Sequence, residues 1–207
     1  MNTLKRTSIF FKMSVLFSLS FLIFTNGYAQ IDIEKHSDLI KPETSLTEDV
    51  VWHVKAFRPD AQILKVKAID KKGNIYDVKA FQAPESSSSV LSVKAVENNK
   101  RLPVKIILPI NDEKYFPLVA IDDDGKLLKI IAINDEGHYL EVKGHSKSGN
   151  IINISAITKN NLGYNILALS PFGEVNSVVG IKMLDTAEEA VINGVPIYAH
   201  LKAIKQN

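Results

Sequence analysis

A repeat of twelve residues runs through most of the chain and alternates hydrophobic with polar positions. Written in twelves from Tyr115, six successive units align without a gap as far as Thr186. In each of these units the fourth position is a branched aliphatic residue and the sixth is Ala or Gly. The same register returns in units that begin at Val51, Ile63, Ile75, Val90, Arg101 and Tyr198. The pattern therefore predicts twelve copies of one structural element.

Each unit predicts one β-strand followed by one turn. Positions 1 to 7 alternate and are rich in Val, Ile and aromatic residues, which is typical of a strand. Position 8 is a short polar residue such as Asp70 or Asp122, and position 11 is Gly in five units and Asn161 in one. This is the sequence of a type I turn followed by a left-handed residue, a turn that joins antiparallel neighbours. A parallel β-solenoid with twelve residues per rung is the alternative.

The predicted turns place position 6 of one strand opposite position 2 of the next. Ala56 then lies beside Leu64, and the same rule places Ala132 beside Leu140 and Gly144 beside Ile152. Large and small residues alternate along every row of the even-numbered face, as they do in the packed interior of a β-protein. The even positions are therefore expected to form the core, and the odd positions to lie outside it.

The expected fold class is all-β: an antiparallel meander of about twelve short strands, closed as a flattened barrel or a two-layer sandwich. The segment 186–189 has the spacing of a helix capping box, and Ala, Val and Ile follow it. This spacing predicts one short helix before the last strand.

The N-terminal segment has the pattern of a secretory signal peptide. Three cations precede an apolar run at 13–24, and Gly27 and Ala29 supply the small residues of a cleavage site. An uncleaved membrane anchor is the alternative, but the run is shorter than the ~20 residues that span a bilayer. We expect residues 1–29 to be removed, 30–50 to be an arm or linker, and 51–207 to be the β-repeat domain. The mature protein would then be secreted or periplasmic, without a membrane span.

Composition and charge narrow the choice of class and partner. The chain has 207 residues, 45% of them hydrophobic, and no Cys, so stability in an oxidising compartment must come from a packed core. The net charge is +2, but without the three cations of the leader 22 basic residues stand against 23 acidic ones, a net charge of −1. This balance gives no support to nucleic acid as a partner.

The VKA tripeptides of the first half of the chain, of which Val78-Lys79-Ala80 is the third, carry a family resemblance. The run ILKVKAIDKKGNIYDVKAF, together with the signal peptide, resembles uncharacterised secreted repeat proteins of Bacteroidota-type bacteria, a family of unknown function. The resemblance covers residues 51–100 well and the later units more loosely. It implies an exported bacterial protein and transfers no catalytic residue.

Lysine occupies position 5 in seven units, and this is the most regular polar feature of the chain. Five of the seven fall in consecutive predicted strands, namely Lys55, Lys67, Lys79, Lys94 and Lys105. A row of amines on the odd face could bind a regularly charged polymer such as an acidic polysaccharide. The alternative is a solvated sheet face kept soluble by lysine. Asp77, which the register places opposite Lys67, weakens the binding hypothesis.

Two aromatic residues at the start of the repeat complete the set of candidate ligand-binding residues. The register places Trp52 on the core face and His53 outside, so Trp52 is either a packing residue or an exposed stacking platform. His138 and His145 lie in a turn and at the far end of the next strand, ~20 Å apart, which is too far for a shared metal. The segment 122–125 is expected to be a polar turn rather than a calcium loop.

The sequence contains none of the common catalytic motifs, and we expect no cofactor, metal or catalytic residue. We therefore expect an exported, non-catalytic protein that binds or structures an extracellular or envelope polymer, with carbohydrate favoured. One alternative is a polysaccharide-active hydrolase or lyase, with its site in the irregular segments 31–49 and 108–114 and near Glu188. The other alternative is an interaction domain for another exported protein.

Overall fold

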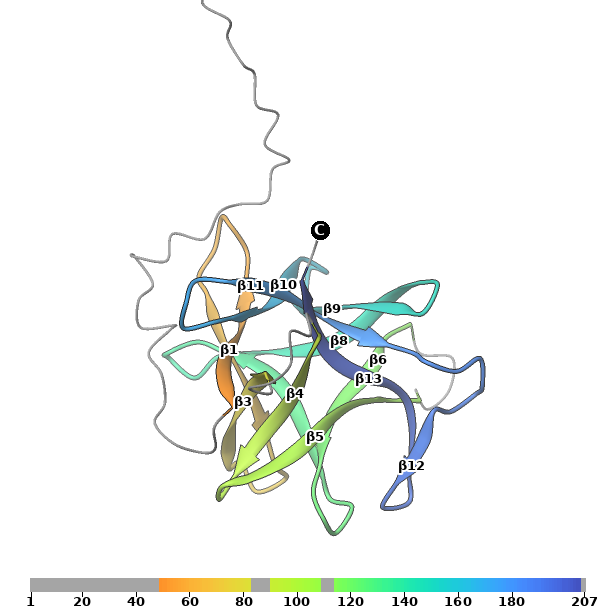
Figure 1. Ribbon diagram of the computed structural model, residues 1–207. Coiled ribbons are helices and arrows are strands. Elements are labelled where there is room, and N and C mark those ends of the chain that lie inside the picture. The colour runs from red at the N-terminus through yellow and green to blue at the C-terminus, as the bar shows by residue number, and fades with distance from the viewer. Residues whose placement is uncertain (1–48, 83–89, 109–113, 206–207) are drawn as a thin grey trace, which may run out of the picture. The chain divides into compact units, whose positions relative to one another are not determined.

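The computed structural model describes residues 49–82, 90–108 and 114–205, and their regular secondary structure is entirely β (Figure 1). The predicted signal peptide and nearly all of the predicted arm lie outside the described residues. These residues form no helix, and hence none that is long and apolar enough to cross a membrane. The strands are β1 (Val50–Phe57), β2 (Leu64–Ile69), β3 (Ile75–Gln82), β4 (Val90–Glu97), β5 (Lys100–Ile107), β6 (Phe116–Ile121), β7 (Leu127–Ile133), β8 (Tyr139–Ser148), β9 (Ile151–Ile157), β10 (Gly163–Leu169), β11 (Val175–Ile181), β12 (Ala190–Ile192) and β13 (Val195–Lys205).

The turns between strands have the hydrogen bonds that the sequence predicts. In the β2–β3 turn the Gly73 N–H donates to the Asp70 carbonyl at 3.1 Å, and Gly73 has a φ of 89°. Asp70 Oδ1 accepts the N–H groups of Lys72 and Asn74 at 2.8 and 3.0 Å. The Asp70 N–H also donates to the Asn74 carbonyl at 3.1 Å. Four more turns have both of these backbone bonds, and they begin at Asp122, Asn134, Thr158 and Ser170. The short polar residue at position 8 is therefore needed because its side chain closes the turn.

All strand pairs are antiparallel, and twelve of the strands gather in four groups of three. Within each group every strand pairs with the other two. We call these groups corner 1 (β1, β2, β3), corner 2 (β4, β5, β13), corner 3 (β6, β7, β8) and corner 4 (β9, β10, β11). Six further pairs, one for each pair of corners, are β1–β10, β2–β7, β3–β4, β5–β6, β8–β9 and β11–β13. The pairing network has the connectivity of a tetrahedron, with four corners and six edges.

One register rule generates all four corners. Position 5 of each strand pairs with position 3 of another, and the cycle closes after three strands. In corner 1 the three pairs are Lys55–Lys65, Lys67–Asp77 and Lys79–His53. Along an edge, two position-5 residues pair with each other, as Lys79 does with Lys94. Each twelve-residue unit therefore takes part in one threefold corner and one twofold edge, which explains why identical units can close on one another.

The even positions form one continuous core, as the alternation predicts. Position-4 residues such as Val54 and Ile130 are buried, and the Ala residues of position 6 are fully buried. The pairs Ala56–Leu64 and Ala132–Leu140 are confirmed.

One predicted neighbour pair has the wrong register. Gly144 pairs with Ile154 rather than Ile152, and the β8–β9 ladder is irregular between Gly144 and Ser146. The reason is that β8 and β9 belong to different corners, so the edge register applies to them. The corner register, which was predicted for every hairpin, does not apply to this one.

The predicted short helix is wrong. Residues 184–187 are bends, and β12 follows as a strand paired with β13. Asn193 and Gly194 join the two strands with φ values of 48° and 80°, and Asn-Gly is a strong hairpin signal. The Thr186 hydroxyl donates to the Glu188 carbonyl instead of capping a helix. The described residues therefore form thirteen strands where about twelve were expected.

Candidate functional site

The position-5 lysines form triangles at the corners rather than a row along a sheet. Corner 1 holds Lys55, Lys67 and Lys79, corner 2 holds Lys94, Lys105 and Lys202, and corner 3 holds Lys143. The alternative of a solvated sheet face does not describe corner 1, because Lys55 and Lys79 are only 8% and 6% exposed, and the other position-5 lysines are half-buried. Three side chains around one axis cover one another, whereas lysines along a flat sheet would remain in water.

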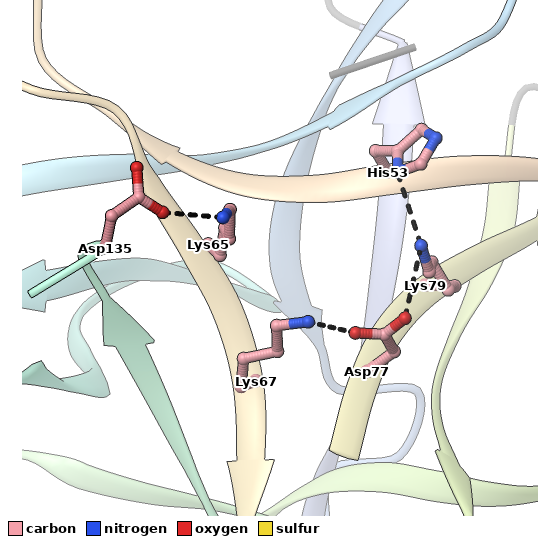
Figure 2. Close-up of polar contacts among 6 residues, drawn as sticks. All are labelled: His53, Lys65, Lys67, Asp77, Lys79 and Asp135. Carbon is pink, nitrogen blue, oxygen red and sulfur yellow. Dashed lines mark hydrogen bonds and ion pairs between the residues drawn. The ribbon is translucent and has the colours of Figure 1, made fainter. Parts of the chain in front are cut away.

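The lysines of corner 1 are matched by acidic side chains. Asp77 lies between Lys67 and Lys79, forming an ion pair with the first and lying 3.5 Å from the amine of the second (Figure 2). Lys65, which lies on β2 with Lys67, pairs with Asp135 at 2.6 Å (Figure 2). The predicted Lys67–Asp77 contact is therefore confirmed, and carboxylates offset part of the positive charge of this corner.

Trp52 and His53 do not present a binding surface. Trp52 is 3% exposed, packs in the core and donates from Nε1 to Gln82 Oε1 at 3.1 Å, so it is a packing residue and not a stacking platform. His53 points to the odd face, as expected, but it is 8% exposed and its Nδ1 lies 3.3 Å from the Lys79 amine. Both residues belong to the structure of corner 1.

Corner 2 brings three lysines together without a matching acid. The register sets Lys202 opposite Ser92, Lys94 opposite Pro103 and Lys105 opposite His200. The Lys202 amine donates to Ser92 Oγ at 3.1 Å, and the Lys105 amine lies 2.6 Å from His200 Nδ1. No carboxylate within the described ranges forms an ion pair with any of the three lysines.

In corner 2, burial and the charges of neighbouring lysines lower the pKa values of two lysines and of His200. Burial, followed by the charges of Lys94 and Lys202, lowers the pKa of Lys105 to about 8. Burial and the charge of Lys202 also lower the pKa of Lys94. The pKa of His200 is lowered by burial and by the charge of Lys105, so the imidazole is neutral at pH 7. The fold thus holds three repelling cations in place.

Glu189 lies near Nε2 of His200, whereas the Lys105 amine lies near Nδ1 of the same ring. The Glu189 side chain is 2% exposed, and its oxygens lie 3.8 Å from His200 Nε2 and 3.8 Å from the Lys182 amine. Burial would raise the pKa of Glu189, but backbone N–H groups, among them that of Leu184, and the charge of Lys182 outweigh it and lower the pKa. In the segment near Glu188, one of those suggested for a catalytic site, Glu189 is therefore held in its charged form beside His200.

An open groove with a volume of about 640 Å³ lies on the outer face of corner 3. Tyr115 and Tyr139 line it together with Glu141, and Tyr139 is 56% exposed. Glu141 forms ion pairs with Lys129 and, at 2.6 Å, with Lys143. The groove therefore combines aromatic surface with fixed polar groups, which is the chemistry of a site for a polar ring such as a sugar.

The carboxylates of this groove are held in their charged form. Hydrogen bonds from Lys129 and Lys143 lower the pKa of Glu141. The pKa of Asp70 is also lowered, first by the hydrogen bond from the Asn74 side chain. A glycosidase needs one carboxyl group with a raised pKa to act as its acid. The groove is therefore better suited to binding than to acid–base cleavage.

Other candidate residues are placed as follows. His145 Nε2 lies 3.0 Å from Ser155 Oγ, and His138 donates its backbone N–H to Asn134 Oδ1 in a turn. Within the part of the chain that the structure describes, no group of three acidic, His or Cys side chains could hold a metal. Residues 31–48 and 109–113, part of the suggested catalytic segments, lie outside the described ranges.

Sequence reasoning missed two parts of the site. Lys202 is one of the seven position-5 lysines, but only the pairing of β13 with β4 and β5 places it beside Lys94 and Lys105. The tyrosines of the groove, Tyr115 and Tyr139, both occupy position 1 of their units. That shared position was the available signal, and it needed the knowledge that β6 and β8 share a corner.

Comparison with family models matches residues 48–204 to a family of unknown function, DUF7486. No curated protein and no solved structure matches the chain.

Proposed function

Because the chain belongs to DUF7486, a family whose function is unknown, its role must be inferred from its own residues, and we propose that it is an exported, non-catalytic protein that binds an acidic extracellular or envelope polysaccharide. The binding surface is corner 2. Export rests on the signal-peptide pattern of residues 1–29.

The observation that carries this proposal is the contrast between corners 1 and 2. Both place three lysines around one axis, but Asp77 pairs with two lysines of the first set and no described acid pairs with the second. Mutual repulsion in corner 2 destabilises the free protein, and a bound anion would relieve it. Without the leader the chain has a net charge of about −1, so the attraction is local to this corner and not a property of the whole surface.

The groove at corner 3 supports carbohydrate as the polymer. Tyr139 offers an exposed aromatic face, and Glu141 and Lys143 offer hydrogen-bonding groups of fixed orientation. Such a combination suits a sugar ring, whose faces are apolar and whose edges are hydroxyl groups.

Titration of the purified protein against a panel of acidic and neutral polysaccharides tests the proposal. Binding should be confined to the acidic members and should weaken steeply as salt rises, because the contacts are ionic. Lys94→Met should weaken binding, whereas Lys67→Met, which removes the same charge from corner 1, should not. Equal loss in both variants would assign binding to general surface charge.

Two outcomes would replace the proposal with its alternatives. Turnover of any polysaccharide would make the protein a hydrolase or lyase. Failure to bind any polysaccharide, together with specific capture of one exported protein, would make it an interaction domain. Export is tested separately by mass spectrometry of the mature chain, which should begin at Gln30. An intact Met1 terminus in a membrane fraction would contradict cleavage.

A further inference from the structure

The three amines of corner 2 surround a pseudo-threefold axis. Each of the three lysines is directly opposite a position-3 residue, and the next lysine lies two residues further along that strand. Each lysine is therefore the diagonal neighbour of the next, a relation that sets side chains ~7–8 Å apart at their origins. Lys94, Lys105 and Lys202 consequently form a near-equilateral triangle whose long side chains can all reach one point above its centre.

A ligand that satisfies all three amines at once must present three acceptors around its own axis. A sulfate or phosphate monoester does so, because three terminal oxygens surround the bond to the ester oxygen. A carboxylate presents two oxygens in a plane and is matched best by the planar fork of arginine. Lysine ammonium groups are compact point charges that impose no plane. The corner is therefore matched to a tetrahedral oxyanion and only partly to a carboxylate.

We propose that corner 2 binds a tetrahedral oxyanion ester, sulfate or phosphate, carried by the polysaccharide. This inference rests on the proposed function and names the chemical group that the polymer must carry. Lys105 and Lys202 are oriented for this role by His200 and Ser92, and Lys94 has no hydrogen bond or ion pair in the described part of the chain. Charge neutralisation by the ester would also relieve the repulsion that lowers the pKa of Lys105.

The other three corners lack this arrangement. At corner 1 Asp77 occupies the position that Ser92, Pro103 and His200 hold in corner 2, and it pairs with two of the lysines. The position-5 residues of corner 3 include one lysine, and those of corner 4 are Ser155, Leu167 and Val179. One oxyanion site per chain is therefore expected from the four corners.

Four dextrans of matched length separate the possible ligand groups: dextran sulfate, dextran phosphate, carboxymethyl dextran and unmodified dextran, the three charged forms at equal charge density. At low ionic strength the purified protein should bind the sulfate or the phosphate form at least about tenfold more tightly than the carboxymethyl form, the factor expected for one further charge-assisted hydrogen bond. The two ester forms identify which oxyanion is preferred. Unmodified dextran should not bind.

Variants assign the site. Lys94→Met and Lys202→Met should each lower the affinity for the preferred ester at least about tenfold. Lys67→Met, with the same loss of charge at corner 1, should leave it unchanged. Urea denaturation of each variant checks the fold, and no loss of stability is expected because each substitution at corner 2 removes repulsion.

The failures are distinguishable. Equal affinity for the ester and carboxymethyl forms, with Lys94→Met weakening both, would overturn the oxyanion inference and leave acidic-polymer binding intact. No binding to any charged dextran, and none to the wider panel of acidic polysaccharides, would overturn both. A Lys67→Met effect as large as that of Lys94→Met would overturn the assignment to corner 2.

Discussion

Gly180 and Ile106 test whether the core is packed as the pseudo-symmetry requires. Position 6 is Ala in most units, but the degenerate fifth unit places Ile106 there, and Gly180 lies against it at the same position of β11. A Cβ atom added to Gly180 would lie 2.2 Å from Ile106 Cδ1 and 3.1 Å from Ile152 Cβ. The Cδ1 methyl group of Ile106 therefore occupies the space that a side chain at 180 would fill.

The magnitude follows from these distances. Carbon atoms in good contact lie about 3.5–4.0 Å apart, so Gly180→Ala forces Ile106 out of its place. Overpacking of this kind costs ~1–3 kcal/mol in the free energy of unfolding. Ile106→Val alone removes the clashing methyl group and costs ~0.5–1.5 kcal/mol by leaving a small void. In the double variant the new Cβ occupies that void, so the two costs should fall short of additivity by about 1 kcal/mol or more.

Urea denaturation of the wild type, the two single variants and the double variant gives the coupling directly, provided that the m-values agree. Gly163→Ala is the matched control, because its Cβ would lie 3.4 Å from Ser155 and its φ is not in the left-handed region. It should change stability by no more than ~0.5 kcal/mol. A Gly180→Ala variant as stable as this control, or strictly additive single costs, would refute the packing described here.

Three further predictions concern the register, a turn and the lysine corner. Ala132→Leu should cost ~1–3 kcal/mol because Ala132 is fully buried, whereas Lys129→Thr on the outer face should change stability by no more than ~1 kcal/mol; comparable losses in urea would contradict the placement of the even positions in the core. Asp70→Asn should lower the urea midpoint at pH 7, because the carboxylate accepts two turn N–H groups and its pKa is lowered from 3.8; the difference from wild type should shrink as pH falls below 3.8, and a difference independent of pH would argue against a charged acceptor. Lys105→Met should raise the urea midpoint at pH 7, because a pKa of about 8 in the fold against 10.5 means that the charged amine destabilises the folded state; the gain should fade between pH 8 and 10.5, and a loss of stability at pH 7 would show that the corner is not repulsive.

Local features of the fold were predictable because they depend on single units. Alternation identifies strands, and a short polar residue at position 8 with Gly at position 11 identifies turns; both are confirmed at Asp70 and Gly73. The closure of the strands into four corners was not predictable from neighbours. It depends on pairs such as β1–β10 and β4–β13, which join units far apart in the chain. The sequence left open a flattened barrel or a sandwich, and the network is better described by its corners.

The short helix that the sequence predicted does not form, and the reason lies in the residues that follow the capping box. The segment 186–189 has the spacing of a capping box, but only a few residues separate it from Asn193 and Gly194. A helix of one turn gains little, because nucleation costs more than its few hydrogen bonds return. Pairing with β13 satisfies the backbone of Ala190–Ile192 and buries Glu189 beside His200. The Asn-Gly sequence therefore predicts the structure of this segment better than the capping-box spacing does.

The lysines show how far one pattern can predict a site. Their regular spacing at position 5 was visible, and so was Asp77, but a flat sheet implied one row of equivalent amines. Corners divide the same residues into a set that is partly paired with an acid and a set that has no acid partner among the described residues, and the difference is whether a position-3 neighbour is Asp77 or a residue such as Ser92. Charge pattern alone could not predict this, because Ser92 becomes the neighbour of Lys202 only when the two ends of the domain pair.

The two faces of the strands have different roles in this architecture. Even positions are filled mainly by aliphatic and aromatic residues and by Ala or Gly, and they form the main core. Odd positions vary from corner to corner: acid-paired lysines at corner 1, unmatched lysines at corner 2, a tyrosine-lined groove at corner 3 and uncharged residues at corner 4. Some odd positions, such as Ile121 and Ile131, are buried as well, so only substitution at an odd position outside such contacts changes what a corner presents without changing how it packs. The charges of Lys105 and Lys94 lower the stability of the folded state, and because the core does not depend on the lysines of corner 2, the fold can hold a repelling cluster that a bound anion would stabilise.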